Sequence, residues 1–508
     1  MIVILDFGSQ YTQLIARKVR ESNVYCEIHP FSTSWEKIKP LGATGIIFSG
    51  GPSSVYAKGA PKPDKKIIES GLPILGICYG LQVLVDYFGG KVVPSPKREF
   101  GPAMVKVQSR DTLFSDLPNT LPVWMSHGDA ATRMPSGFET LAITENAPHA
   151  VIRHPEKNLF GVQFHPEVHH TPNGATILKN FTHRVCKDPA SWSMKSFVDE
   201  ATREIENQVG GDKVILGLSG GVDSSVLAAL LHRAIGHQLT AIFVDNGVLR
   251  HGEKERMKQI FDGSLGKELR IINASNKFLS KLKKVTDPEK KRKIIGREFI
   301  NVFDKEARKI KKVKFLAQGT IYPDVIESVS VKGPSETIKS HHNVGGLPAK
   351  MKLKLVEPLR YLFKDEVRAL GIELGLPKEL INRHPFPGPG LAIRILGEVT
   401  KERVKLLQQA DLIVETEIRA AGLYDQLWQA FAVLLPVKSV GVMGDQRTYE
   451  NTVAIRAVTS KDAMTADWAD LPRPVLVRIS NRIINEVRGI NRVVLDISSK
   501  PPATIEWE

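Results

Sequence analysis

A cysteine between two glycines is the first group in this sequence that could do chemistry. Cys78 lies in the pattern Gly-x-Cys-x-Gly with Gly76 and Gly80, after the apolar run LPIL and before the apolar run VLVDYF. This spacing is that of a nucleophile elbow, a strand-to-helix turn in which only glycine leaves room for the crowded backbone. The helix N-terminus would favour a thiolate and offer backbone N–H groups to an oxyanion. The alternative is a buried apolar cysteine.

A nucleophilic cysteine also needs a base, and the run GVQFHPE offers one. His165 ends an apolar, strand-like stretch, and Glu167 follows two residues later. An acid beside the imidazole would orient it, as the logic of a catalytic triad requires. Taken singly, His165 is equally a structural histidine and Glu167 a surface carboxylate. Together with Cys78 they predict a thiol-based active site, to which the glycine-rich turn FSGGPSSV (48–55) could add oxyanion donors.

A second chemical motif is the run LGLSGGVDSSV, residues 216–226, which follows an apolar strand and opens a helix. The backbone N–H groups from Ser219 to Ser225, with the helix dipole behind them, would form a cradle for an anion. The run is not a Walker A loop, because that pattern needs Gly-Lys-Ser/Thr and this run has no lysine. An ordinary Gly-Gly turn is the alternative for the glycines alone.

The elements that carry these motifs alternate short Val/Ile/Leu-rich runs with amphipathic ones. The first segment contains MIVILDF, ATGIIFSG and LPILGI, and the second contains KVILGLSGG, LTAIFVDNG and VKFLAQGT. This alternation predicts an α/β protein with two successive doubly wound domains and mainly parallel sheets. After the proline- and glycine-rich run 382–390, helices and strands mix in an α+β pattern. The predicted domains are 1–187, 188–383 and 384–508.

Composition narrows the class of protein. The 508 residues include three cysteines without a CxxC pair, which suits a reducing cytosol and argues against a structural zinc site. No apolar run is long enough to span a bilayer, so we expect a cytoplasmic protein with no membrane contact. The net charge of +15 suits nucleic acids or small polyanionic substrates. The basic runs 281–293 and 308–314 lack interleaved aromatic residues and are interpreted as solvated helix faces.

The first segment resembles the class I glutamine amidotransferase family, whose motifs SGGP, CYG and HPE occur here in the family's order. The resemblance implies that Cys78 attacks the side-chain amide of glutamine, that His165 transfers the proton and that Glu167 orients the imidazole while ammonia leaves. It also implies that the glutamine and oxyanion contacts are Gly50, Gly51, Tyr79 and Gln82.

The run SGGVDSS resembles the PP-loop of the ATP pyrophosphatase family, in which the loop binds the β and γ phosphates and the α phosphate is attacked. The products are then an adenylated substrate and pyrophosphate. Asp223 would contact Mg²⁺, or be an acid favoured at a helix N-terminus, and both can hold at once. The implied ATP contacts are Ser219, Gly220, Gly221, Val222, Asp223, Ser224, Ser225 and, beside the adenine, Val244.

Further runs across the chain resemble the glutamine-hydrolysing GMP synthase family. They are GTIYPDVIES (319–328), IKSHHNVGGLP (338–348), GDQRTYEN (444–451) and KPPATIEWE (500–508). Leu81, where the family commonly has methionine, is a volume-conserving departure. The resemblance implies that XMP, ATP, glutamine and water give GMP, AMP, pyrophosphate and glutamate. The xanthine 2-oxygen would attack the α phosphate, and ammonia would displace AMP from carbon 2.

The same resemblance implies further site residues and a partner. Asp324 and Glu327 would lie beside the reacting groups, and a lid would carry Lys339, His341 and His342 toward the phosphates. The tail would close over XMP through Lys500, Ile505 and Glu506. The two prolines, whose fixed φ should hold the chain extended, and a buried-type Trp507 favour a docked tail over a frayed one. The family's partner is a second copy, which gives a homodimer through the C-terminal domain, with no stable nucleic-acid partner.

Two other functions are compatible with parts of this sequence. A tRNA-modifying PP-loop enzyme would suit the basic composition, but its sulfur-transferring branch needs cysteines beside the ATP site, and all three cysteines precede residue 187. The lysine-attaching branch needs no cysteine and no amidotransferase domain. A non-enzymatic scaffold predicts a broken triad or loop, and both motifs are intact.

Overall fold

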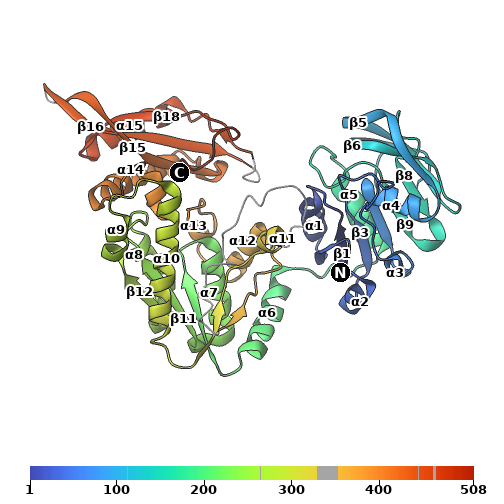
Figure 1. The fold of residues 1–508 in the computed structure, drawn as a ribbon, viewed down its shortest axis with the longest axis horizontal. Helices are drawn as coiled ribbons and strands as arrows, with labels where there is room; N and C mark the ends of the chain where they lie inside the picture. The colour runs from blue at the N-terminus through green and yellow to red at the C-terminus, as the bar shows by residue number, and fades with distance from the viewer. Residues whose placement is uncertain (111, 264, 329–352, 444, 461–464) are drawn as a thin grey trace. The chain divides into compact units, whose positions relative to one another are not determined.

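The structure is a computed structural model that describes residues 1–110, 112–263, 265–328, 353–443, 445–460 and 465–508 (Figure 1). The chain divides into two compact units, residues 1–197 with 323–336 and residues 198–322 with 337–508. Within the described ranges, every helix is too short or too polar to cross a membrane.

The first unit is built on a nine-stranded sheet with the strand order β2-β1-β3-β4-β9-β8-β7-β5-β6. The strands β2, β1, β3, β4 and β9 run parallel to one another, and the remaining four pair antiparallel. Every residue of β3 and β4 is buried, as expected for parallel strands covered on both faces. The bounds are β1 Ile2–Asp6, β2 Cys26–Pro30, β3 Gly45–Phe48, β4 Ile74–Ile77, β5 Lys91–Val107, β6 Thr120–Arg133, β7 Glu139–Ile143, β8 Val151–His154 and β9 Leu159–Val162.

Helices α1, α2 and α3 connect the parallel strands, α4 leads from β4 into β5, and α5 follows β9. Their bounds are α1 Thr12–Glu21, α2 Trp35–Ile38, α3 Lys65–Ile68, α4 Tyr79–Tyr87 and α5 Gly174–Lys179. The predicted α/β class is confirmed, and the structure adds the long antiparallel hairpin β5–β6. That hairpin carries Ser126 to the site described below.

The second unit contains a five-stranded sheet, all parallel, with the order β12-β11-β10-β13-β14. The order reverses between β10 and β13, which is the switch point where open parallel sheets bind ligands at their carboxyl ends. The strands are β10 Lys213–Leu218, β11 Leu239–Asp245, β12 Leu269–Asn273, β13 Val313–Ala317 and β14 Lys354–Val356. The helices are α6 Met194–Val209, which begins at the unit boundary, α7 Val222–Ile235, α8 Glu253–Asp262, α9 Ser275–Leu282, α10 Pro288–Ala307, α12 Lys364–Glu373 and α13 Lys378–Ile381. Helix α11, Tyr322–Ser328, begins at the end of this segment, and from Pro323 onward it belongs to the first unit.

The C-terminal part of this unit is an α+β layer, as predicted. The hairpin β15–β16 is antiparallel, β17 pairs with the end of β16, and β18 runs parallel to β16. Buried side chains from the parallel sheet, including Ile215 and Ile242, and from this layer, including Ile455 and Ile479, form one hydrophobic cluster. The bounds are α14 Lys401–Ala420, β15 Gln429–Met443, β16 Gln446–Thr459, β17 Asp467–Trp468, α15 Arg473–Glu486 and β18 Ile490–Asp496.

The C-terminal tail is docked in the second unit by buried cations. Lys291 is fully buried on α10, and its ammonium donates to the backbone oxygens of Ala392 (3.2 Å) and Ile395 (2.7 Å) and to the Glu508 carboxylate. Burial lowers the pKa of Lys291, and the ion pair with Glu508 opposes that shift. Lys291 belongs to the basic run 281–293, so the interpretation of that run as a solvated face is wrong at this residue.

Two buried arginines hold the rest of the tail. Arg394 donates to both carboxylate oxygens of Glu506 at 3.0 and 2.7 Å. Arg456 donates to the carbonyl oxygen of Thr504 at 3.0 Å and of Ile505 at 3.4 Å. The predicted docking is therefore confirmed, and these cations cause it.

The sequence analysis expected docking because of a buried Trp507 and an extended pair of prolines, and both expectations are wrong. Trp507 is 37% exposed. The prolines lie in a turn, in which the Ala503 N–H donates to the Ser499 oxygen at 3.1 Å, because proline fixes φ and leaves ψ free to reverse the chain.

Lys291→Met should lower the free energy of unfolding of the second unit by about 3 kcal/mol, because it leaves the buried Glu508 carboxylate and two carbonyl oxygens without their donor. Urea denaturation of the full chain measures this, with the exposed Lys293→Met as the matched control. Equal midpoints for the two variants would contradict the structural role of Lys291.

Candidate active sites

The predicted nucleophile elbow is present between β4 and α4. Cys78 has φ +50° and ψ −103°, a backbone conformation that non-glycine residues rarely adopt. A Cβ on Gly76 would lie 2.4 Å from the Gly80 carbonyl carbon, and a Cβ on Gly80 would lie 2.5 Å from the Phe48 oxygen. Both glycines are therefore required by close backbone contacts, as the spacing predicted.

Cys78 is buried, and its sulfur contacts two groups that the sequence analysis missed. It lies 3.7 Å from the backbone oxygen of Ser126 on β6, and the Gln163 side-chain amide donates to it at 3.6 Å. Gln163 lies two residues before His165 in the run GVQFHPE, just after β9 ends at Val162. This proximity to His165 was the available signal for Gln163, whereas the Ser126 contact arises from the antiparallel hairpin and has no local sequence signal.

His165 and Glu167 form the rest of the predicted triad. The His165 Nδ1 lies 2.8 Å from the Glu167 Oε1, and both side chains are buried. Burial lowers the pKa of His165, but hydrogen bonds to Cys78 and Glu167 outweigh it and raise that pKa to about 10. The ring edge of Tyr11 packs against the imidazole at a centroid distance of 5.3 Å. The imidazole is thus held between a thiol and a carboxylate, protonated over the neutral pH range.

The other residues predicted for this site lie near it, in part with side chains engaged elsewhere. A Cβ on Gly50 would be 3.2 Å from the His165 Cε1, and one on Gly51 would be 2.7 Å from a backbone oxygen. The Tyr79 hydroxyl donates to the Pro61 oxygen at 2.8 Å, and burial raises the pKa of Tyr79 to about 12. The Gln82 amide donates to the Asp129 oxygen at 3.2 Å. The side chains of Tyr79 and Gln82 therefore bind backbone carbonyls.

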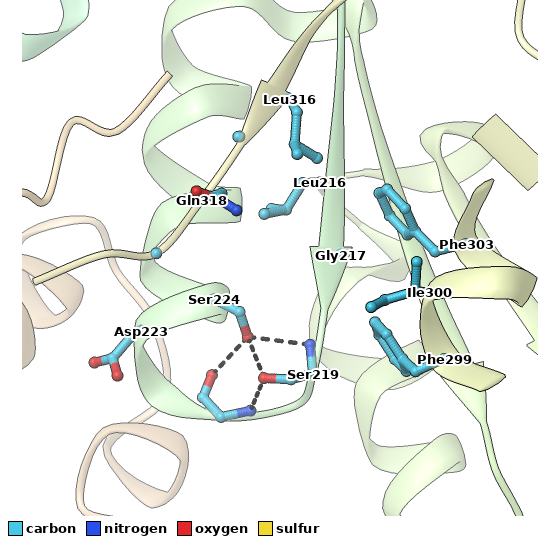
Figure 2. A pocket seen from close by; sticks show the side chains of 13 residues that line it. Leu216, Gly217, Ser219, Asp223, Ser224, Phe299, Ile300, Phe303, Leu316 and Gln318 are labelled. Atoms are coloured by element: carbon cyan, nitrogen blue, oxygen red, sulfur yellow. Dashed lines mark hydrogen bonds between the residues drawn. The ribbon is translucent and has the colours of Figure 1, made fainter. Parts of the chain in front are cut away.

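The second motif forms the turn between β10 and α7 (Figure 2). The Ser224 hydroxyl accepts from the Ser219 N–H at 3.2 Å and contacts the Ser219 hydroxyl at 3.0 Å. The Gly221 N–H donates to the Ser219 hydroxyl at 3.3 Å, and Gly220 has φ +79°. These bonds fix a loop at the N-terminus of a 14-residue helix, where backbone N–H groups favour an anion.

A pocket of about 270 Å³ opens beside this loop at the carboxyl ends of β10 and β13. Phe299, Ile300 and Phe303 of α10 form an apolar wall facing the polar loop (Figure 2). Of the predicted ATP contacts, Ser219, Gly221, Asp223 and Ser224 line the pocket. Gly220, Val222, Ser225 and Val244 are not among its lining residues, and the Val222, Ser225 and Val244 side chains are buried. An apolar slot next to an anion cradle fits a ring joined to phosphate groups.

Asp223 is the carboxylate of this pocket, and its partner is a lysine that the sequence analysis did not assign. The Lys364 Nζ, at the start of α12, lies 2.5 Å from both Asp223 oxygens. The described residues contain no cluster of three His, Cys, Asp or Glu side chains arranged for a metal ion. One carboxylate nevertheless fits Mg²⁺ that arrives with phosphates, because Mg²⁺ typically takes one or two carboxylates and completes its shell with water and phosphate oxygens.

Comparison with known proteins places the chain in a family. Residues 3–185 match "Glutamine amidotransferase class-I", residues 194–295 match "NAD synthase" and residues 416–507 match "GMP synthase C terminal domain". The chain is 59% identical over 507 residues to the GMP synthase [glutamine-hydrolyzing] of Brachyspira hyodysenteriae, covering 100% of this chain and 99% of that protein. Aquifex aeolicus has a relative with the same name, identity and coverage, and the Dehalococcoides mccartyi one is 60% identical over 509 residues, 100% of this chain and 95% of that protein.

The chain belongs to the glutamine-hydrolysing GMP synthase family. It is therefore an enzyme, and the resemblances seen in its sequence are confirmed. The match to the GMP synthase C-terminal domain ends at residue 507, so it includes all but the last residue of the tail.

The remaining predicted residues lie in the tail, in α11 and in the run for which a lid was predicted. Asp324 is in the first turn of α11, which also contains Glu327. Lys500 exchanges two backbone hydrogen bonds with Ala466, and Ile505 packs against a cluster of Phe431, Val433 and Ala454. The Glu506 carboxylate binds Arg394 and also accepts from Gln429 at 2.8 Å. The lid residues Lys339, His341 and His342 lie outside the described residues.

The PP-loop of the synthase is held from behind by a buried ion pair. Arg383 pairs with Glu253, each about 4% exposed, and donates to the Gly220 oxygen at 3.1 Å. A Cβ on Gly220 would lie 2.7 Å from the Glu253 Oε1. Glu253 of α8 and Arg383 of the run 382–390 thus hold the loop in place together. The sequence analysis interpreted that run only as a domain boundary.

Glu167→Gln should lower the pKa of His165, because it removes the carboxylate that holds the imidazolium. In the wild-type protein the pKa is raised from 6.5 to about 10. Protonated His165 therefore stabilises the folded first unit fully below pH 6.5, and this stabilisation is lost as the pH rises through about 10. Nitrogen-15 NMR titration of the histidines measures the shift, and Glu139→Gln, at an exposed carboxylate, is the control. A His165 titration unchanged by Glu167→Gln would refute the assignment.

Proposed function

We propose that the two sites carry out two halves of GMP synthesis, with glutamine hydrolysis at Cys78 and activation of XMP by ATP at the PP-loop pocket. The observation that carries the proposal is the thiol–imidazole–carboxylate arrangement at a strained elbow, in which His165 bridges Cys78 and Glu167. The chain's membership in the glutamine-hydrolysing family supports it. The same membership favours this function over a tRNA-modifying enzyme or a scaffold.

At the first site, Cys78 attacks the carbon of the glutamine side-chain amide with its proton already held by the His165 imidazolium. The proton then passes to the leaving nitrogen, ammonia departs, and water hydrolyses the resulting thioester to glutamate. Glu167 keeps the imidazole oriented throughout, since its Oε1 lies 2.8 Å from the Nδ1. Gly50, which has no side chain beside His165, leaves room there for the amide and its oxyanion, and Gly51 adds a backbone N–H.

At the second site, the apolar wall of α10 accommodates the adenine and the loop binds the phosphates. The xanthine 2-oxygen attacks the α phosphorus, pyrophosphate leaves, and ammonia displaces AMP from carbon 2. Mg²⁺, held by Asp223 and the phosphates, would neutralise charge on the leaving pyrophosphate. The lid residues Lys339, His341 and His342, with Asp324 and Glu327, are assigned to this step.

The C-terminal layer is assigned two roles. Lys500, Ile505 and Glu506 contact XMP, and the layer also joins two copies in a homodimer. Exposed apolar side chains on adjoining strands support the second role: Val440, Val442, Tyr449 and Val494. Exposed apolar side chains of this kind are buried in isologous dimers.

The wider assignments made from the sequence are retained as part of this proposal. The chain has three functional domains, 1–187, 188–383 and 384–508. It works in the cytoplasm, and its positive charge serves nucleotide binding and solubility without a stable nucleic-acid partner.

Cys78→Ala should reduce GMP formation from glutamine by about 1,000-fold or more, because no other group can form the thioester. Synthesis with ammonium should be largely retained, since the second site does not use the thiol. Rates with each nitrogen source measure the split. Asp223→Ala is the reciprocal control and should lose both rates; equal loss of both in Cys78→Ala would contradict the division of labour.

Lys500→Ala should raise the XMP concentration needed for half-maximal rate by about 10- to 100-fold, through loss of a charge-assisted contact to the XMP phosphate. Basal glutamine hydrolysis should not change. Steady-state kinetics with varied XMP test this, with the exposed Lys401→Ala as the control. An unaltered XMP requirement would remove Lys500 from the site.

A further inference from the structure

A buried acid–base pair lies beside the thiol site and takes no part in the chemistry described above. The side chains of His127 on β6 and Glu99 on β5 are 1% and 7% exposed, and the His127 Nε2 lies 3.1 Å from a Glu99 oxygen. The Thr144 hydroxyl donates to the same carboxylate at 3.0 Å and accepts from the Ala147 N–H at 2.9 Å. The desolvation of a buried pair offsets most of its attraction. Fold stability alone therefore gives no strong reason for these two groups.

The other ring nitrogen of His127 holds the backbone of its own strand. The His127 Nδ1 lies 3.0 Å from the backbone oxygen of Asp129. A carbonyl oxygen can only accept, so Nδ1 carries a proton and donates it. The Glu99 carboxylate at Nε2 orients the ring for this bond, because the partner of one imidazole nitrogen determines the role of the other. The same Asp129 oxygen accepts from Gln82 of α4 at 3.2 Å. Two buried side chains thus hold one carbonyl oxygen.

The backbone held in this way borders the thiol site. The Ser126 oxygen, one residue before His127, lies 3.7 Å from the Cys78 sulfur. The Trp124 oxygen, farther back on β6, accepts from the His165 N–H at 3.0 Å. The backbone of β6 therefore contacts both the nucleophile and the base. A displacement of this backbone by about 1 Å would change the space beside the sulfur in which the glutamine amide must lie.

The pairing of β5 with β6 does not fix this part of β6 by itself. The register of the two strands shifts between Pro94 and Glu99. Their partners are Asp129 and His127, so Gly128 lies opposite the shift. Pro94 has no N–H to donate to its partner, and a Cβ on Gly128 would meet no atom within 4 Å. Packing and strand hydrogen bonds are therefore weak at this point, and the side-chain bond from His127 compensates for them.

We propose that His127 is a positioning residue for glutamine hydrolysis. With Glu99 orienting its ring, His127 holds the Asp129 carbonyl and, through it, the backbone of β6 beside Cys78. It acts through that backbone and not by contact with the reacting atoms. The inference rests on the proposed assignment of glutamine hydrolysis to Cys78. It adds a residue that determines the shape of the thiol site, whereas His165 and Glu167 determine its proton transfer.

Two substitutions in the full chain separate the two ring nitrogens of His127. The amide nitrogen in His127→Asn takes the place of Nδ1 and can donate to the Asp129 oxygen, but the Nε2 partner of Glu99 is lost. The longer amide in His127→Gln reaches Glu99 and leaves the Asp129 oxygen without this donor. The kcat/KM for glutamine hydrolysis should fall about 5- to 10-fold in His127→Gln, mainly through KM, and stay within about twofold of wild type in His127→Asn. The urea midpoint should fall more in His127→Asn, because a buried carboxylate loses a partner.

A control and the ammonium reaction separate positioning from general damage. His149→Gln changes a histidine of the same unit whose Nδ1 lies 2.6 Å from the Thr140 hydroxyl, and it should alter neither kcat/KM nor KM for glutamine. GMP formation from ammonium should be unchanged in every variant, since it does not use the thiol site.

The outcomes distinguish this inference from the function on which it rests. A lower kcat/KM in His127→Gln, with recovery in His127→Asn, supports the positioning role. An unchanged kcat/KM in His127→Gln, or an equal or greater loss in His127→Asn, overturns it while leaving Cys78 as the nucleophile. If His127→Asn does not fold, kcat/KM of His127→Gln at an unchanged urea midpoint decides alone. Glutamine hydrolysis that survives Cys78→Ala overturns the proposed function of the site and the inference with it.

Discussion

Both chemical sites depend on a strand that turns into a helix where a Cβ would collide with its surroundings. At the first, Gly76 and Gly80 let β4, α4 and β3 approach so closely that added Cβ atoms would lie within 2.5 Å of backbone atoms. At the second, Gly220 has φ +79°, and a Cβ there would lie 2.7 Å from the Glu253 side chain. The close approach places the helix N-terminus at the carboxyl edge of a parallel sheet, where its N–H groups are available to an anion. The backbone at these turns therefore determines where the reactive side chains lie.

The charge arrangement differs between the two sites because their ligands differ. Around Cys78, one cation, the His165 imidazolium, lies between the thiol and a buried carboxylate, and its raised pKa reflects both partners. Such a group can take and return one proton within a closed site. The nucleotide pocket is instead open and bears a carboxylate on an anion-binding loop. The Lys364 ammonium pairs with that carboxylate at 2.5 Å.

The sequence was sufficient for features encoded by neighbouring residues. Strand runs, the two glycine turns and the His165–Glu167 pair are local patterns, and the structure places them as predicted. It was insufficient where distant segments meet. Gln163 reaches Cys78 from the segment after β9 and Ser126 from β6, and Lys364 reaches Asp223 from 141 residues away. Lys291 was interpreted as part of a solvated face because its neighbours in the run 281–293 are charged. The sequence does not indicate that this lysine alone among the basic residues of the run is buried.

The tail and the nucleotide pocket are joined by one helix, and this gives the buried cations a role beyond stability. Lys291 in the first turn of α10 binds Glu508, whereas Phe299 and Phe303 farther along the same helix wall the pocket. At about 1.5 Å per residue, the two contacts lie roughly 12 to 18 Å apart on a rigid element. A buried ammonium is costly without its carboxylate, so the position of the tail and the position of α10 are coupled. Under the proposed function, closure of the tail over XMP and the shape of the ATP pocket are therefore set by the same helix.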